Sequence, residues 1–139
     1  MKHALLLSLA IFFLLHTQSL LAFHRTSESD TVRVRVYYFH AKIRCQACLT
    51  IEQYSTETMH SVFHKELRAG KIRWQVINFE DSLTEHYIDQ YKLENQALIV
   101  AKIRNGKEVE WKLLDKIWEL LGDRKKFEQY VVKNVRRWL

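Results

Sequence analysis

The first clear pattern in the chain is an alternation of valines and arginines from Val32 to Val36. It runs directly into the continuous apolar segment 36–39, Val-Tyr-Tyr-Phe. Strict alternation is typical of a strand with one buried face, and a continuous apolar end indicates burial on both faces. The pattern predicts a first strand over residues 32–39 whose far end lies deep in the protein.

A stretch without proline or glycine follows from Gln46 to Ala69, and Gly70 supplies the signal that ends it. Its apolar stripe recurs at helical spacing and is made of Cys48, Ile51, Tyr54, Thr58, Met59, Val62, Phe63 and Leu67. We therefore predict one long helix. Alternation resumes at Ile72, Trp74 and Val76, and Ile77 and Phe79 follow, which predicts a second strand. A strand, a helix and a strand in succession form a crossover unit, so the two strands should be parallel.

The second half of the chain predicts a short helix over 81–91, a third strand over 97–103 and a fourth over 107–111. Asn105-Gly106 between the last two is a strong hairpin signal. Residues 113–121 favour a helix, and Asp123 is a candidate N-cap for a final one. The final helix carries apolar residues at Phe127, Tyr130, Val131, Val135 and Trp138. The order predicts an α/β fold of three layers, with a mixed four-stranded sheet and helices on both faces.

The N-terminus carries a separate signal. A short basic start, Met1-Lys2-His3, precedes an apolar run from Ala4 to Leu15, which is short for a membrane span and typical of a signal peptide. We predict a signal peptide over residues 1–22, cleaved after Ala22 or Ser19, with an uncleaved anchor as the alternative. Residues 23–31 then form a tether and 32–139 the folded domain. Both alternatives predict a periplasmic or secreted domain.

Composition narrows the function further. The formal net charge is +6, but the basic residues are spread along the chain, and export argues against nucleic acid as a partner. Only three glycines are present, and neither a phosphate-binding loop nor a dinucleotide fingerprint occurs. No cofactor is therefore predicted. The four tryptophans, Trp74, Trp111, Trp118 and Trp138, fall at strand and helix positions that favour core packing over an aromatic-compound pocket.

The candidate chemistry lies in the segment Cys45-Gln46-Ala47-Cys48, at the start of the long predicted helix. Unpaired N–H groups and the helix dipole favour a thiolate at this position, and Arg44 and Lys42 add positive charge. We expect a lowered pKa at Cys45, which would act as the attacking thiolate, while Cys48 would resolve the mixed disulfide. Cys45 and Cys48 are the predicted catalytic residues.

Three alternatives to a redox pair stay open at this point. A structural disulfide would close a very small loop, which constrains the unfolded chain by only about 2 kcal/mol. A metal-binding or metallochaperone module could use both thiolates with His40, which could otherwise donate a proton near the cysteines. The domain could also be an interaction subunit. His60 and His64, four residues apart, are a weaker metal candidate.

The strand, Cys-x-x-Cys at a helix start, strand, helix, hairpin and final helix resemble the thioredoxin superfamily over residues 32–139. More narrowly, the chain resembles the nitrophenyl-compound nitroreductase ArsF-subunit family. The segments that carry this resemblance are Val36-Tyr37-Tyr38-Phe39-His40, Arg44-Cys45-x-x-Cys48, Thr50-Ile51-Glu52 and Lys116-Ile117-Trp118-Glu119-Leu120. The resemblance implies an electron-relay role in the reduction of nitroaromatic compounds, with a membrane or periplasmic redox protein as partner.

Two positions depart from ordinary thioredoxins. Those proteins place a cis-proline opposite the active cysteines, where this chain has Glu94-Asn95-Gln96-Ala97. Because a cis bond without proline costs about 3 kcal/mol, we expect trans geometry there. Thioredoxins also bury an acidic residue at the position of Tyr38. The missing cis-proline argues against ordinary exchange with extended protein substrates, because the resemblance implies that this backbone pairs with them.

Overall fold

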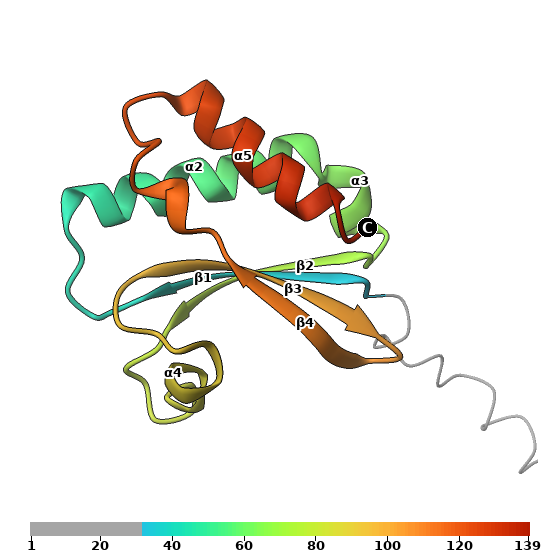
Figure 1. Cartoon of the computed structure of the whole chain (residues 1–139), viewed down its shortest axis with the longest axis horizontal. Coiled ribbons are helices and arrows are strands. Elements are labelled where there is room, and N and C mark those ends of the chain that lie inside the picture. The colour runs from blue at the N-terminus through green and yellow to red at the C-terminus, as the bar shows by residue number, and fades with distance from the viewer. Residues whose placement is uncertain (1–31) are drawn as a thin grey trace, which may run out of the picture.

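The computed structural model describes residues 32–139, which form four strands and five helical segments (Figure 1). In chain order these are β1 Val34–His40, α2 Gln46–Val62, α3 His64–Arg68, β2 Ile72–Asn78, α4 His86–Tyr91, β3 Ala97–Arg104, β4 Lys107–Leu113, the short 3-10 helix η4 Asp115–Ile117, and α5 Arg124–Arg136. The signal peptide and tether predicted for residues 1–31 lie outside the described residues. Within residues 32–139, every helix is too short or too polar to cross a membrane.

The strands form one sheet in the order β2-β1-β3-β4. β1 runs parallel to β2, with Val36 opposite Trp74, and antiparallel to β3, with Val36 opposite Val100. β4 pairs antiparallel with β3 through the hairpin. The predicted mixed four-stranded sheet, including its parallel first pair, is confirmed.

Helices cover both faces of this sheet: α2 and α5 lie on one face and α4 on the other (Figure 1). Side chains alternate along β1 between two cores. Val34, Val36 and Tyr38 join the core beneath α2 and α5, whereas Tyr37 and Phe39 join the aromatic core beneath α4. The apolar end of β1 is buried on both faces, as its sequence predicts, and the result is a thioredoxin-like α/β fold.

The hairpin between β3 and β4 follows its sequence signal closely. Asn105 and Gly106 have φ angles of 52° and 73°. Two successive positive φ angles are the requirement of a type I′ turn, which asparagine followed by glycine satisfies with little strain. The turn fixes β4 as the outer neighbour of β3.

Two helix predictions are wrong in detail. The predicted single helix from Gln46 to Ala69 is divided at Phe63, whose φ of −110° and ψ of 21° interrupt the helix between α2 and α3. The Phe63 side chain is buried in the core. The helix predicted over 113–121 is instead the end of β4, the single turn η4 and further turns, because β4 continues to Leu113.

The tryptophans divide between core and surface. Trp74 and Trp138 pack against the core beneath α2 and α5, as predicted. Trp111 and Trp118 are 38% and 39% exposed, so the core prediction is wrong for these two. Trp111 lies on β4 at the edge of the sheet, where its ring contacts Tyr91 of α4 but stays partly exposed, and Trp118 follows the short η4 turn.

Candidate functional site

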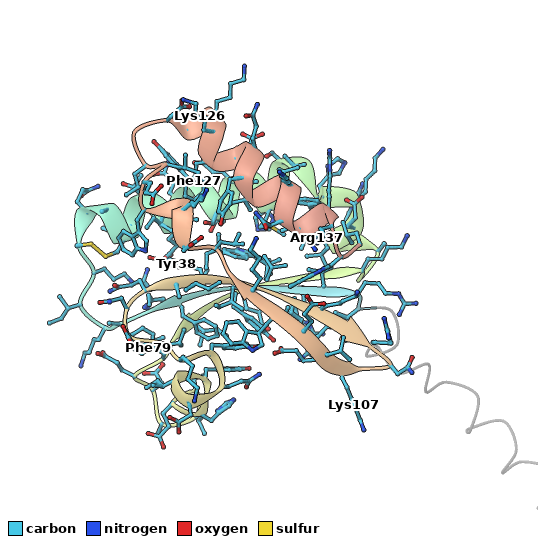
Figure 2. The ribbon with its side chains drawn as sticks, in the orientation of Figure 1. Tyr38, Phe79, Lys107, Lys126, Phe127 and Arg137 are labelled. Carbon is cyan, nitrogen blue, oxygen red and sulfur yellow. A yellow bond between two sulfur atoms is a disulfide. The ribbon has the colours of Figure 1, made fainter. Side chains whose placement is uncertain are left out.

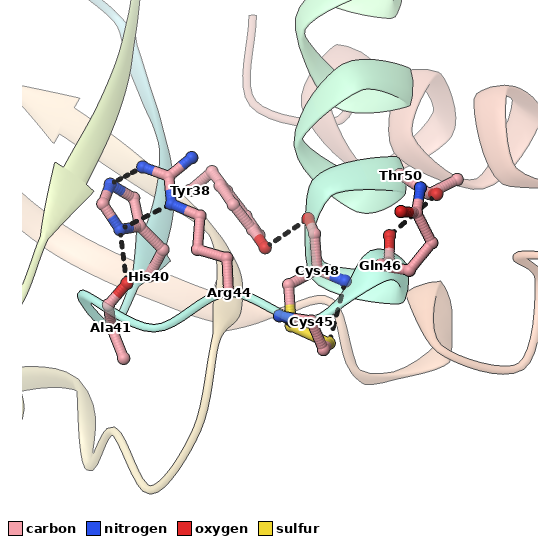
Figure 3. The surroundings of a disulfide bond; sticks show 8 residues. All are labelled: Tyr38, His40, Ala41, Arg44, Cys45, Gln46, Cys48 and Thr50. Carbon is pink, nitrogen blue, oxygen red and sulfur yellow. Dashed lines mark hydrogen bonds between the residues drawn. A yellow bond between two sulfur atoms is a disulfide. The ribbon is translucent and has the colours of Figure 1, made fainter.

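Cys45 and Cys48 form a disulfide at the start of α2, with their Cα atoms 5.1 Å apart (Figure 3). Cys45 is the N-cap residue of the helix and is exposed, whereas Cys48 is in the first turn and is 2% exposed. The prediction that Cys45 lies at the helix start and that Cys48 is better covered is confirmed. Cys45 is therefore the more accessible of the two cysteines to an attacking reagent.

Both sulfur atoms accept hydrogen bonds from the helix start. The backbone N–H of Cys48 donates to Cys45 Sγ at 3.1 Å, and the N–H of Cys45 donates to Cys48 Sγ at 3.3 Å. The two cysteines thus make the reciprocal contacts of a capping box, with sulfur in place of oxygen. An N–H group donates more strongly to a negatively charged acceptor than to a neutral one. The same contact would stabilise a thiolate at Cys45 after reduction.

Arg44 extends away from the disulfide toward the end of β1 (Figure 3). Its guanidinium group forms an ion pair with Glu52 on α2 and donates to Nε2 of His40. The other ring nitrogen of His40, Nδ1, lies 2.9 Å from the carbonyl oxygen of Ala41, to which it can donate. The charge of Arg44 is therefore shared with a carboxylate, and the helix N–H group is the contact that stabilises the sulfur.

The loop that carries Arg44 is also held from the opposite side. The backbone N–H of Lys42 donates to Oε2 of Glu80 at 2.8 Å, beyond the end of β2. Together with the ion pair to Glu52, this contact fixes the segment between β1 and α2 at both of its sides. The position of Cys45 is set by these contacts rather than by burial of its own side chain.

Tyr38, on β1, points toward the first turn of α2 beside Cys48 (Figure 3). Its hydroxyl donates to the carbonyl oxygen of Cys48 at 2.7 Å, and its side chain is fully buried. Burial raises the pKa of Tyr38 to about 12; the nearby Glu52 carboxylate adds to this rise, and Arg44 opposes it. Tyr38 is thus a neutral hydrogen-bond donor at physiological pH and holds the first turn of α2 against β1.

The segment before β3 has trans geometry, as expected: residues 32–139 contain no cis peptide bond. It borders a cavity of about 220 Å³ whose other walls come from the end of α4 and from the end of β4. The lining residues are Tyr91, Lys92, Leu93, Glu94, Asn95, Gln96, Ala97, Leu113, Asp115 and Trp118. Neither cysteine lines this cavity, so it is a separate feature from the disulfide.

The histidines do not gather into a metal site within residues 32–139, where no group of three or more potential ligands occurs. His40 is buried and occupied by Arg44 and Ala41. His60 belongs to α2 and His64 to α3, on either side of the break at Phe63. They border a shallow hollow with Leu67 and Arg68, and both are exposed.

Glu52 is the member of the site that the residue pattern did not single out. In the sequence, Glu52 belongs to the segment Thr50-Ile51-Glu52 that resembles the ArsF-subunit family, and that resemblance implies no role for it. Its spacing of four residues from Cys48 places both on the same side of α2, a relationship that helical periodicity can supply. Its pairing with Arg44 crosses from helix to loop, which periodicity cannot show.

Comparisons with known proteins find similarity to solved structures at low sequence identity. No family model and no curated protein matches the sequence. Solved structures that resemble the chain include Fasciola hepatica thioredoxin, at 16% identity over 81% of this chain and 86% of that one, with a TM-score of 0.45. Trxlp from Edwardsiella tarda is 19% identical. The match covers 69% of this chain and 88% of that chain, with a TM-score of 0.44. A mutant thioredoxin from Entamoeba histolytica is 16% identical. The match covers 78% of this chain and 88% of that chain, with a TM-score of 0.41.

Proposed function

We propose that this protein is an extracytoplasmic thiol–disulfide electron carrier that works through Cys45 and Cys48. The observation that carries the proposal is the asymmetry of the pair. Cys45 is exposed at the N-cap of α2 and its sulfur accepts a helix N–H group, whereas Cys48, one turn further along, is 2% exposed. An exposed attacking sulfur beside a covered resolving sulfur is the arrangement that two-step disulfide exchange requires.

The exchange proceeds in two balanced steps. The reduced Cys45 thiolate attacks a disulfide of the oxidised partner, which forms a mixed disulfide and releases one partner thiolate. Cys48 then loses its proton and attacks the Cys45 sulfur, which forms the Cys45–Cys48 disulfide and releases the second partner thiolate. Two electrons pass to the partner, and a donor with its own dithiol returns the protein to the reduced state by the reverse sequence.

The resemblance to the ArsF-subunit family supplies the finer part of the proposal. In this role the protein relays electrons within a system that reduces nitroaromatic compounds, with a membrane or periplasmic redox protein as its partner. The chain lacks a flavin-type or dinucleotide motif in its sequence, so nitro reduction itself is assigned to another subunit. The signal-peptide pattern of residues 1–22 supports export to the compartment in which such a disulfide persists.

A redox titration tests the central claim. The full chain is equilibrated in dithiol buffers of defined potential and then alkylated, and the fraction of reduced protein is measured by mass. We expect a reversible two-electron transition in the range of known thiol–disulfide carriers, between about −120 and −270 mV. A pair that stays oxidised well below about −300 mV would be a structural disulfide, and the carrier proposal would be wrong.

A further inference from the structure

The outer edge of β4 combines features that point to a protein contact. β4 is the last strand of the sheet in the order β2-β1-β3-β4, so within residues 32–139 nothing pairs with its outer side. Three of its side chains are large, apolar and exposed: Val109 at 52%, Trp111 at 38% and Leu113 at 44%. An edge strand that exposes several apolar side chains is a template for pairing with another strand.

The backbone of β4 presents its free groups at regular positions. The N–H of Leu114 donates to the carbonyl oxygen of Leu98 at 2.9 Å. Residues of an antiparallel strand alternate between those that bond to the neighbour and those that point away from it. Lys112 and Glu110 therefore bond inward to β3, and Trp111 and Leu113 turn their N–H and C=O groups to the outer edge. This edge is ready to accept a strand centred near Trp111.

The charges along β4 match those of a second copy of the same strand. In an antiparallel pair centred on Trp111, Glu110 lies opposite the partner's Lys112, and Lys112 opposite the partner's Glu110. Both residues lie on the face of the sheet that carries α5, since Lys112 Nζ reaches Asn134 Oδ1 at 2.8 Å. Within residues 32–139, the Glu110 carboxylate has no hydrogen-bond or ion-pair partner. Opposite charges facing each other across two strands stabilise their pairing.

The apolar side chains of β4 also face one another in the antiparallel pairing centred on Trp111. Trp111 would lie opposite the partner's Trp111 on the face that carries α4, where its ring already meets Tyr91 edge-on with the ring centres 5.3 Å apart. Val109 would lie opposite the partner's Leu113, and Val109 is also the extra residue of the bulge in the β3–β4 register, so the pairing ends there and covers residues 109–113. We propose that the edge of β4 is a homodimer interface, in which two copies join antiparallel through residues 109–113.

This dimer would extend the sheet to eight strands and leave the disulfide accessible. The loop with Cys45 follows β1, which is two strands inward from β4. Since neighbouring strands lie about 4.8 Å apart, the edge of β4 is about 10 Å from β1 across the sheet. The exposed side of Cys45 does not belong to the paired edge, and each copy could exchange electrons independently.

Charge reversal tests the proposed register. The full chain in mild detergent is examined by analytical ultracentrifugation over a range of concentrations. In Glu110→Lys two lysines face each other, and in Lys112→Glu two glutamates do; because the dimer is symmetric, each repulsive pair occurs twice. Each variant should weaken the dimer by on the order of 10- to 100-fold. The double variant restores opposite charges and should return the dissociation constant to within about threefold of the original. A chain that is monomeric throughout, or a double variant as weak as the single ones, would overturn the proposal and leave the edge for a different protein.

Cysteine crosslinking supplies a second, independent measurement. In a Cys45→Ser/Cys48→Ser background, Trp111→Cys places two cysteines opposite each other with Cα atoms about 5.5 Å apart, within reach of a disulfide. Leu113→Cys is the matched control, because its two copies would be offset by four residues, about 14 Å. We expect a covalent dimer with Trp111→Cys and none with Leu113→Cys. Equal crosslinking of the two variants, or none in either, would contradict the register.

Discussion

The hydroxyl of Tyr38 donates to the carbonyl oxygen of Cys48 at 2.7 Å, and this contact joins the buried strand β1 to the first turn of α2. Tyr38 is fully buried, and Cys48 carries the covered sulfur of the redox pair. A neutral donor at this position fixes the height of the helix start above the sheet. It also means that no acid from β1 is available to take the proton from Cys48 during disulfide formation.

Replacing this tyrosine should change how stability depends on pH. Burial raises the pKa of Tyr38 to about 12, above the value of about 10 for an exposed tyrosine. Between these two values the folded protein holds a proton that the unfolded chain has lost, so stability falls as pH rises from about 10 to about 12. Tyr38→Phe should reduce this slope by up to about 1.4 kcal/mol per pH unit, as measured by urea unfolding at several pH values.

Tyr130 provides the control for this measurement. Its pKa is also raised to about 12, first by burial and then by its hydrogen bond to Asp115, and it lies on α5 rather than beside the disulfide. Tyr130→Phe should lower the alkaline slope without altering the reduction potential of the cysteines. Tyr38→Phe should alter both. An unchanged alkaline slope in Tyr38→Phe would show that the tyrosine does not ionise with folding as inferred.

The ion pair between Arg44 and Glu52 should contribute measurably to stability. Both side chains are about one-quarter exposed, at 25% and 26%, and the guanidinium also donates to His40. Glu52→Gln removes the charge and leaves Arg44 partly buried beside a neutral amide. We expect a loss of about 1 kcal/mol in the free energy of unfolding, measured with urea near neutral pH.

The matched control is Glu57→Gln on the same helix. Glu57 pairs with Arg124, but these side chains are 40% and 56% exposed, and such pairs contribute about 0.5 kcal/mol or less. The Glu52 variant should also show a shifted reduction potential, because the freed Arg44 charge can turn toward the Cys45 thiolate. Equal effects of the two variants on stability and potential would contradict a special role for the pair.

Local signals explain why much of the fold could be predicted. The alternation in β1, the parallel crossover to β2 and the Asn105-Gly106 turn each depend on residues close in sequence, and each is confirmed. The break at Phe63 could not be predicted in the same way, because the apolar stripe continues through it and no glycine or proline marks it. The Phe63 side chain is buried in the core beneath α2 and α5, and the packing of that core depends on residues distant in sequence, which a local pattern does not show.

The candidate site also combines features that the sequence predicts with features that it does not. The placement of Cys45 at a helix start follows from the spacing of the motif and the helix pattern, and the structure confirms it. The direction of the Arg44 side chain does not follow from its neighbours in sequence. It depends on Glu52, which the fold of the loop brings within ion-pairing distance, and on His40 at the end of β1.

Replacing Gly106 or Gly122 with alanine should have different effects on the free energy of unfolding. Gly106 has a φ of 73° in the hairpin, where an alanine side chain is strained, whereas Gly122 has open space at the position of a Cβ atom. Gly106→Ala should lower the unfolding free energy by about 1 kcal/mol. Gly122→Ala should leave it unchanged or raise it by about 0.4–1 kcal/mol, because it reduces the freedom of the unfolded chain. Thermal and urea unfolding of the two variants provide the measurement, and the same sign in both would show that the turn geometry is misassigned.

The order of attack within the cysteine pair gives the most direct prediction about function. Cys48→Ser leaves the exposed Cys45 thiol next to the N–H groups of α2 and removes the resolving sulfur. This variant should react rapidly with an aromatic disulfide reagent and retain a stable mixed disulfide, detected as an adduct by mass spectrometry. Cys45→Ser leaves only Cys48, which is 2% exposed, and its reaction should be slower by about 10-fold or more. The rate of the Cys48→Ser variant, followed against pH, should also report a Cys45 pKa below that of free cysteine. Equal rates in the two variants would mean that burial does not assign the roles, and a Cys45 that titrates like free cysteine would mean that the helix start does not activate the thiolate.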